Sequence, residues 1–220
     1  MKELMLDLEG LTPREANRLI KEESKSHKRL RIVNPHSINF LAAGLTGKIE
    51  LNVDGDLGYY AGSMIDDVRM TVNGRCGWYP ADNMTGGEFI ITKDGGDGAG
   101  QGLYGGIVHV HGNVNSRTGQ IMKNGTIIVG GDAGFMTGLY MMGGRIIVLG
   151  DLGESTGESI IGGVIYFAGN VKSLGKNTAV GELTDSEVGE LRKLFKEKSV
   201  KASPESFRKI TPKTGRPFYG

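Results

Sequence analysis

Apolar residues in the middle of the chain recur with a period of 19 residues. The stretch GTIIVGGDAGFMTGLYMMG from Gly125 aligns with GRIIVLGDLGESTGESIIG from Gly144. Further units of the same length begin at Ile49, Val68, Gly87, Gly106 and Gly163, so seven units follow one another without an insertion. A fixed period of this kind is typical of a solenoid.

Three positions of the unit are apolar in every copy. The third position is Leu51, Met70, Phe89, Val108, Ile127, Ile146 and Ile165, and the fifth is Val53, Val72, Ile91, Val110, Val129, Val148 and Phe167. The seventeenth position is Ile65, Met84, Leu103, Met122, Met141, Ile160 and Ala179. Alternate residues of a strand share one face, so positions three and five predict one buried wall, and position seventeen predicts another.

Glycines recur at positions seven and ten, where they predict tight corners with positive φ, and a third set recurs at position fourteen as part of the repeat. One unit cannot bury its apolar positions alone, whereas stacked units bury them against one another. We therefore predict an all-β fold: a single-stranded, right-handed parallel β-helix of about seven 19-residue coils, with capping helices at both ends. The predicted parts are an N-terminal cap of helix and strand over 1–48, the β-helix over 49–181, and a C-terminal helical cap and tail over 182–220.

The N-terminal cap contains a helix-start signal. Thr12, Pro13 and Glu15 combine a capping box with a proline at the first helical position. They predict a helix that runs to about Ser26. The alternating residues 29–33 then predict a strand that leads into the first coil.

The C-terminal cap begins with a second capping box. Thr184 and Glu187 predict a helix that runs to about Lys198. Ser203-Pro204 predicts a short further turn, and the residues after it, through Gly220, are interpreted as an extended tail.

Charge and cysteine content narrow the function classes. The 26 lysines and arginines nearly balance 25 acids, so the net charge of +1 gives no reason to expect a nucleic acid or a membrane as a partner. The single cysteine, Cys76, excludes an internal disulfide and falls in an apolar column, where we interpret it as a small buried hydrophobe. The charged N-terminus does not resemble a signal peptide, so we expect a cytoplasmic protein.

Three groups of residues could suggest a site, and each has a simpler interpretation. The glycine-rich stretch 94–106 resembles a phosphate loop, but a strand follows it where such a loop needs a helix. His109 and His111 share the outer face of one strand, but a metal site usually needs three or four ligands. Position eight stacks Asp and Asn residues that could suggest calcium; turn residues whose side chains bond their own backbone explain them better. The members of this column are Asp94, Asn113, Asp132, Asp151 and Asn170. We assign no catalytic, cofactor-binding or metal-binding residues.

Position four of the unit faces outward yet becomes apolar along the stack. It includes Ile90, Ile128, Ile147 and Tyr166. Side chains of this kind need a cover. The cover is either the chain's own helix from about Asp185 or a partner subunit, and the sequence leaves both open.

The repeats resemble a known family. The pattern Gly-Asp-x-Gly-x-x-x-Gly at 131–138 and again at 150–157 is similar to the GXGXG domain that closes the large subunit of glutamate synthase. The segments LDLEGLTPREANRLI, GDLGYYAG, ELTDSEVGELRKLF and FRKITP resemble the stand-alone subunit of archaeal and bacterial glutamate-synthase-like enzymes.

The resemblance implies a structural subunit without chemistry or cofactor of its own. Its expected partners are an FMN-binding subunit and a glutaminase-type subunit of a glutamate-synthase-like oxidoreductase complex in glutamate biosynthesis and nitrogen metabolism. Self-association into a homo-oligomer stays open. The alternative is a subunit of a formylmethanofuran dehydrogenase complex, which has a similar β-helix. A carbohydrate-active β-helix enzyme is a weaker rival, because outward position two scatters its charges instead of clustering carboxylates.

Overall fold

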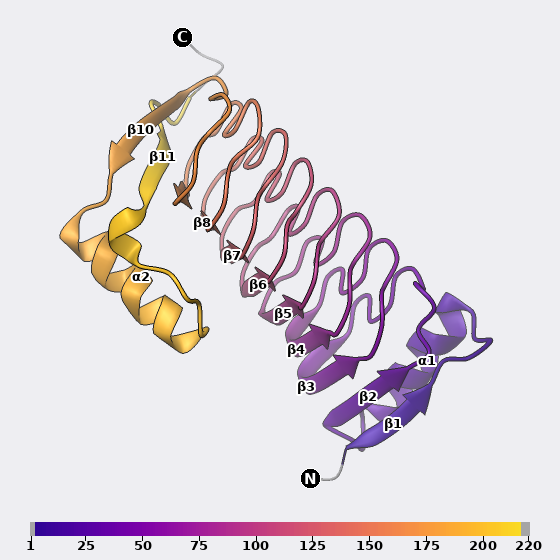
Figure 1. Cartoon of the computed structure of the whole chain (residues 1–220). Helices are drawn as coiled ribbons and strands as arrows, with labels where there is room; N and C mark the ends of the chain where they lie inside the picture. The colour runs from indigo at the N-terminus through magenta and orange to yellow at the C-terminus, as the bar shows by residue number, and fades with distance from the viewer. Residues whose placement is uncertain (1–2, 217–220) are drawn as a thin grey trace.

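The computed structural model describes residues 3–216 as a stack of coils with a cap at each end (Figure 1). One strand from each coil joins a single sheet: β3 (Thr46–Val53), β4 (Asp66–Val72), β5 (Gly87–Ile91), β6 (Ile107–Val110), β7 (Thr126–Val129), β8 (Arg145–Val148) and β9 (Val164–Phe167). Neighbouring strands pair in parallel, and Val110 lies opposite Val129 as the 19-residue period requires. The predicted parallel β-helix of about seven coils is confirmed.

The core lies inside the coils, where the repeat places it. Ile127 and Val129, at positions three and five, are fully buried, as are Met122 and Met141 at position seventeen. Position nine forms a further wall, in which single parallel bridges connect consecutive coils from Leu57 to Val171. The coils therefore bury their apolar positions against one another.

A third side of each coil has backbone in the left-handed region. In the coil that starts at Gly87, Gly98, Gly100 and Gly102 have φ of +67°, +65° and +64°. Their amides donate alternately forward and backward along the stack, to the carbonyls of Ser116, Pro80 and Gln120. The glycine run that resembled a phosphate loop is thus the wall of a coil. Its amide donors are already bonded, so they do not converge on an anion.

Most glycines at positions seven and ten have another role than the one we predicted, and only Gly55 among them has a positive φ, of 134°. Gly74, Gly134 and Gly153 are not in the positive-φ region. They are needed because neighbouring coils approach too closely for a side chain: a Cβ on Gly153 would lie 2.6 Å from the carbonyl carbon of Gly134. A Cβ on Gly74 would lie 2.6 Å from Oδ1 of Asp56.

The N-terminal cap consists of β1 (Leu4–Asp7), α1 (Pro13–Glu23) and β2 (Arg29–Val33). The predicted capping box is present at Thr12 and Glu15. The helix ends earlier than predicted, because the amides of Lys25 and Ser26 bond three residues back, as in a tightening final turn.

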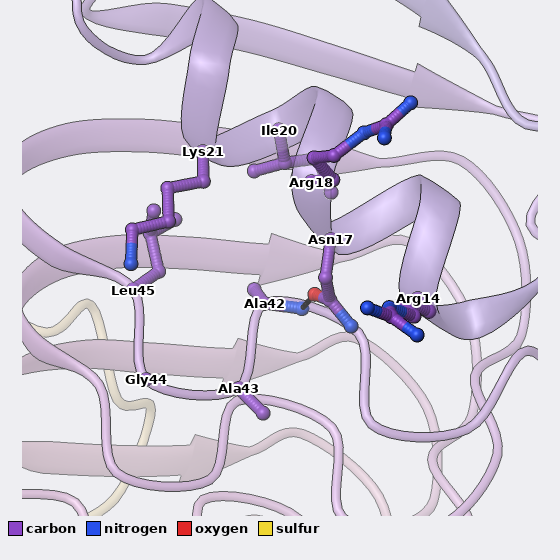
Figure 2. A pocket seen from close by; sticks show the side chains of 9 residues that line it. All are labelled: Arg14, Asn17, Arg18, Ile20, Lys21, Ala42, Ala43, Gly44 and Leu45. Carbon is purple, nitrogen blue, oxygen red and sulfur yellow. Dashed lines mark hydrogen bonds between the residues drawn. The ribbon is translucent and has the colours of Figure 1, made fainter.

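The stacking also begins earlier than the first repeat. β2 pairs in parallel with β3. Residues 34–48, which follow β2, form a further turn of the stack against the first coil. Asn17 fastens α1 to this turn: its Oδ1 accepts from the amide of Ala42 at 2.7 Å (Figure 2). Its Nδ2 donates to the carbonyl of Phe40 at 2.8 Å.

The C-terminal cap consists of β10 (Thr178–Glu182), α2 (Asp185–Glu197), a 3-10 turn (Pro204–Ser206) and β11 (Arg208–Pro212). The helix and the short turn agree with the prediction. The tail differs from it, because β11 lies antiparallel between β9 and β10. A strand is favoured there because the last coil otherwise leaves its backbone groups unpaired. The end of the predicted tail, 217–220, lies outside the described residues.

The last coil is one residue shorter than the repeat predicts. Thr156 pairs with Leu174, eighteen residues on. Thr178 is consequently buried, while Ala179, which we predicted to line the core, is half-buried. Ile210 of β11 is fully buried opposite Ile165 and completes the core at this end.

Candidate functional site

The Asp and Asn column at position eight forms a hydrogen-bonded ladder. Oδ1 of Asp94 accepts from the amide of Asn113 at 2.9 Å, and Oδ1 of Asp132 accepts from the amide of Asp151 at 2.7 Å. Asp94, Asn113, Asp132 and Asp151 each accept from the next coil, so our interpretation that these side chains bond their own backbone is wrong in detail. Because one oxygen of each side chain is engaged in this way, the column connects the coils to one another.

Cys76 lies in the wall at position nine, between Leu57 and Gly95. Its side chain is buried, and burial raises the pKa of the thiol well above its ordinary value. A buried thiol of this kind is protonated and inert at neutral pH.

A group of titratable side chains lies on the outer face of the sheet, below the C-terminal end of α2. It borders a cavity of about 330 Å³. β5 contributes Glu88, and β6 contributes His109 with His111 immediately after the strand. Arg69 comes from β4, and Lys198 is the C-cap residue of α2. The sequence places Lys198 far from the strands, so only the packing of α2 brings these groups together.

Glu88 is the centre of the ionic contacts in this cavity. Arg69 Nη1 lies 2.6 Å from one of its carboxylate oxygens, and Lys198 Nζ lies 3.1 Å from the other. Burial by itself lowers the pKa of Lys198, but its hydrogen bonds to Glu197 and Glu88 raise it. Both oxygens of Glu88 are therefore held by cations, which leaves this carboxylate poorly placed to act as a base.

The two histidines are close but differ in their environments. Their ring centroids are 4.6 Å apart; His109 is buried and His111 is exposed. Burial, with His111 as a second cause, lowers the pKa of His109 to about 4. The imidazole of His109 is therefore neutral at pH 7. Among residues 3–216, no three His, Cys, Asp or Glu side chains gather where they could hold a metal ion.

Outward position two does not assemble an acid and base pair. Its carboxylates, Glu50 and Glu88, each contact an arginine of a neighbouring strand. Arg145, in the same column, lies 3.7 Å from Glu190 of α2. This arrangement differs from the facing carboxylates that a glycosidase needs.

The apolar residues at position four are covered by the chain itself. Ile128 and Ile147 are fully buried, and Tyr166 is nearly so. They pack in one cluster with Leu191, Leu194 and Phe195 of α2 and with Phe207. Of the two covers that the sequence left open, the structure has the chain's own helix.

The turns that connect the strands leave large apolar side chains exposed. Tyr59 stacks on Trp78 with ring centroids 4.9 Å apart, and Tyr60 stacks on Tyr79 at 5.0 Å. Exposed members of this surface are Phe40, Tyr59, Met64, Trp78, Tyr104, Phe135, Tyr140 and Met142. We call it the turn surface. We did not predict it from the sequence, although Tyr59 and Trp78 occupy the same position of consecutive repeats.

Comparisons with known proteins agree with the fold. A family model described as the GXGXG motif matches residues 14–214. No curated protein matches the chain. Among solved structures, the chain is similar to one in the X-ray crystal structure of the formyltransferase/hydrolase complex (FhcABCD) from Methylorubrum extorquens in complex with methylofuran. The two are 24% identical with a TM-score of 0.73, over 93% of this chain and 90% of that one.

These findings confirm one expectation and correct another. The predicted resemblance to the GXGXG domain is confirmed by the family match. The predicted place beside FMN-binding and glutaminase-type subunits is wrong, because the similar structure is that of a formyltransferase/hydrolase complex. The repeats specify the β-helix, and a fold does not by itself determine function. Within residues 3–216, no helix is both long enough and apolar enough to span a membrane.

Proposed function

The chain belongs to the GXGXG motif family, and from this premise we propose that it is the β-helical structural subunit of a formyltransferase/hydrolase-type complex. This corresponds to the alternative identified from the sequence, the formylmethanofuran dehydrogenase subunit. The observation that carries the proposal is the end-to-end likeness to a chain of such a complex, at a TM-score of 0.73 over 93% of this chain.

Two features of the molecule support a structural role. The sheet side is already occupied by α2, which buries Ile128 and Ile147. The turn surface, by contrast, presents Trp78 and Tyr104 to solvent at 49% and 51% exposure. Exposed aromatic side chains are enriched at protein interfaces, so the turn surface is where a partner subunit would pack.

Co-expression tests this proposal directly. We expect the tagged chain to co-purify with the formyltransferase and hydrolase subunits encoded in the same genome, at a fixed ratio measured by light scattering after gel filtration. Trp78→Ser should leave the chain folded and weaken the assembly, because Trp78 is exposed in the free chain. Lys193→Ser, an exposed change on α2, is the matched control. Elution of the wild-type chain separate from those subunits would refute the proposal.

A further inference from the structure

Three cavities lie in a row between the N-terminal cap and the first coils. The first, of about 290 Å³, lies between α1 and the loop 42–45, and the second, of about 230 Å³, shares Lys21, Gly44 and Leu45 with it. The third, of about 340 Å³, shares Lys28 and Ile49 with the second. Shared lining makes them one groove, which we call the N-terminal groove.

The lining of the N-terminal groove is strongly basic although the chain as a whole is nearly neutral. Its cations are Arg14, Arg18, Lys21, Lys25, Lys28, Arg29, Lys48 and Arg69. Its acids are Glu50 and Asp67. One part of the surface therefore concentrates positive charge that is balanced elsewhere in the molecule.

Several of these cations have no ionic partner among the described residues of the chain. Arg18 lies 4.0 Å from Glu22, and Figure 2 shows it directed away from the loop 42–45. Arg29 lies 3.0 Å from Glu50. By contrast, no described acidic side chain forms an ion pair with five exposed members of the groove: Arg14, Lys21, Lys25, Lys28 and Lys48. Of these, Lys28 donates to the carbonyl of Ser24 at 2.8 Å. Like charges that stay unpaired along one groove favour an anionic ligand.

The shape and the floor of the groove indicate what kind of anion fits. The α-helical rise puts Arg14 and Lys21 about 10 Å apart along α1, a span that about three residues of an extended chain cover. The floor is aliphatic, with Ile20, Leu45 and Ile49 almost fully buried. Single-stranded nucleic acids are held by stacking on aromatic rings, and no aromatic residue lines the three cavities within the described part of the chain.

We propose that the N-terminal groove binds an extended acidic segment of a partner protein. Carboxylates of the segment pair with these unpaired cations, and its apolar side chains rest on the aliphatic floor. This proposal does not depend on which complex the chain joins. Its failure and the failure of the proposed function are therefore separate outcomes.

Fluorescence anisotropy with the full chain provides the test. The probe is a labelled peptide of about eight residues that alternates glutamate and leucine. We expect saturable binding that weakens as ionic strength rises, and no binding of the same peptide with glutamine in place of glutamate. The triple variant Arg14→Gln, Lys21→Gln, Lys25→Gln should weaken binding by about tenfold or more.

The matched control removes three exposed cations elsewhere, by Lys93→Gln, Lys193→Gln and Lys201→Gln, and should bind the peptide as the wild type does. Circular dichroism checks that both triple variants are folded. If the groove variant does not fold, the single variants Lys21→Gln and Lys25→Gln replace it, each with a smaller loss expected. Equal loss in the control, unchanged binding in the groove variants, or tighter binding of a single-stranded oligonucleotide than of the peptide would overturn the proposal.

Discussion

At the scale of the residue, glycine has two different functions in this repeat. Gly98, Gly100 and Gly102 supply left-handed backbone, which other residues also adopt at equivalent positions of other coils, as Tyr60 does with φ of 57°. Gly153 allows two coils to pack closely, because the backbone of the preceding coil occupies the space that a side chain would need. Gly153 therefore cannot be replaced by a larger residue unless one of the two coils moves.

We therefore expect Gly153→Ala to destabilise the fold by about 1–3 kcal/mol or more, because the backbone that it contacts cannot rotate away as a side chain can. The matched control is Gly189→Ala in α2, where a Cβ meets nothing within 4 Å. Alanine is the better helix former, so the control should stabilise the protein by up to about 1 kcal/mol. Urea denaturation of both variants measures the two effects, and equal stabilities would contradict this assignment.

His109 makes stability depend on pH. Its folded-state pKa of about 4 lies below the ordinary 6.5, so the unfolded chain takes up a proton in this range that the folded chain does not. The contribution of His109 to the free energy of unfolding is fully present above pH 6.5, and it is lost as the pH falls towards 4. Among the groups that face the ring, His111 and Lys198 lower the pKa of His109 further, and Glu88 raises it by less than burial lowers it.

The variant His109→Ile should remove this dependence, because isoleucine continues the column between Ile90 and Ile128. Its melting temperature at pH 7 should equal or exceed that of the wild type, and its decline between pH 6.5 and 4.5 should be shallower. His111→Gln, a change of the exposed neighbour, should retain most of the wild-type decline. Parallel pH profiles for the wild type and His109→Ile would refute the role of His109.

At the scale of the element, α2 is held both by apolar packing and by charge. Leu191, Leu194 and Phe195 face the sheet. Lys209 Nζ lies 2.7 Å from Glu187, whose pKa burial alone would raise, but the hydrogen bonds from Lys209 and Thr184 lower it to about 2. Lys198 anchors the other end on Glu88. The helix is thus part of the folded unit.

A charge beneath α2 should separate the helix from the sheet. We expect Ile147→Asp to cost several kcal/mol and to yield aggregated or protease-sensitive protein, because Ile147 is fully buried under α2. Thr71→Asp is the matched control in the same column, where the side chain is half-buried. It should remain soluble and fold. Limited proteolysis compares them, and a protected, monomeric Ile147→Asp protein would show that α2 is dispensable.

At the scale of the whole molecule, the two ends of the stack are closed by short strands. β1 closes the N-terminal edge, and β11 with β10 closes the C-terminal edge. Short edges limit pairing with other chains, which an open coil would invite. The basic N-terminal groove and the exposed turn surface are the two parts of the molecule at which we propose that partners bind.

Removing β11 should expose the edge of β9. We expect a chain that ends at Ala202 to self-associate or aggregate, because the strand that pairs with β9 and the buried Ile210 are lost. A chain that ends at Thr214 retains β11 and should stay in the wild-type oligomeric state. Gel filtration with light scattering distinguishes them, and identical profiles would contradict the capping role.

The sequence alone determined the repeat, the inward columns and the starts of both helices, because these depend on periodicity and on contacts a few residues apart. Ile127 and Val129, or Thr184 with Glu187, are therefore assigned correctly from the chain. Tertiary structure decided the rest: α2 as the cover of Ile128 and Ile147, Lys198 beside Glu88, β11 beside β9, and the row of cavities along α1. The physical reason is that these contacts join segments whose separation in sequence carries no period, so only the packing of the caps onto the stack fixes them.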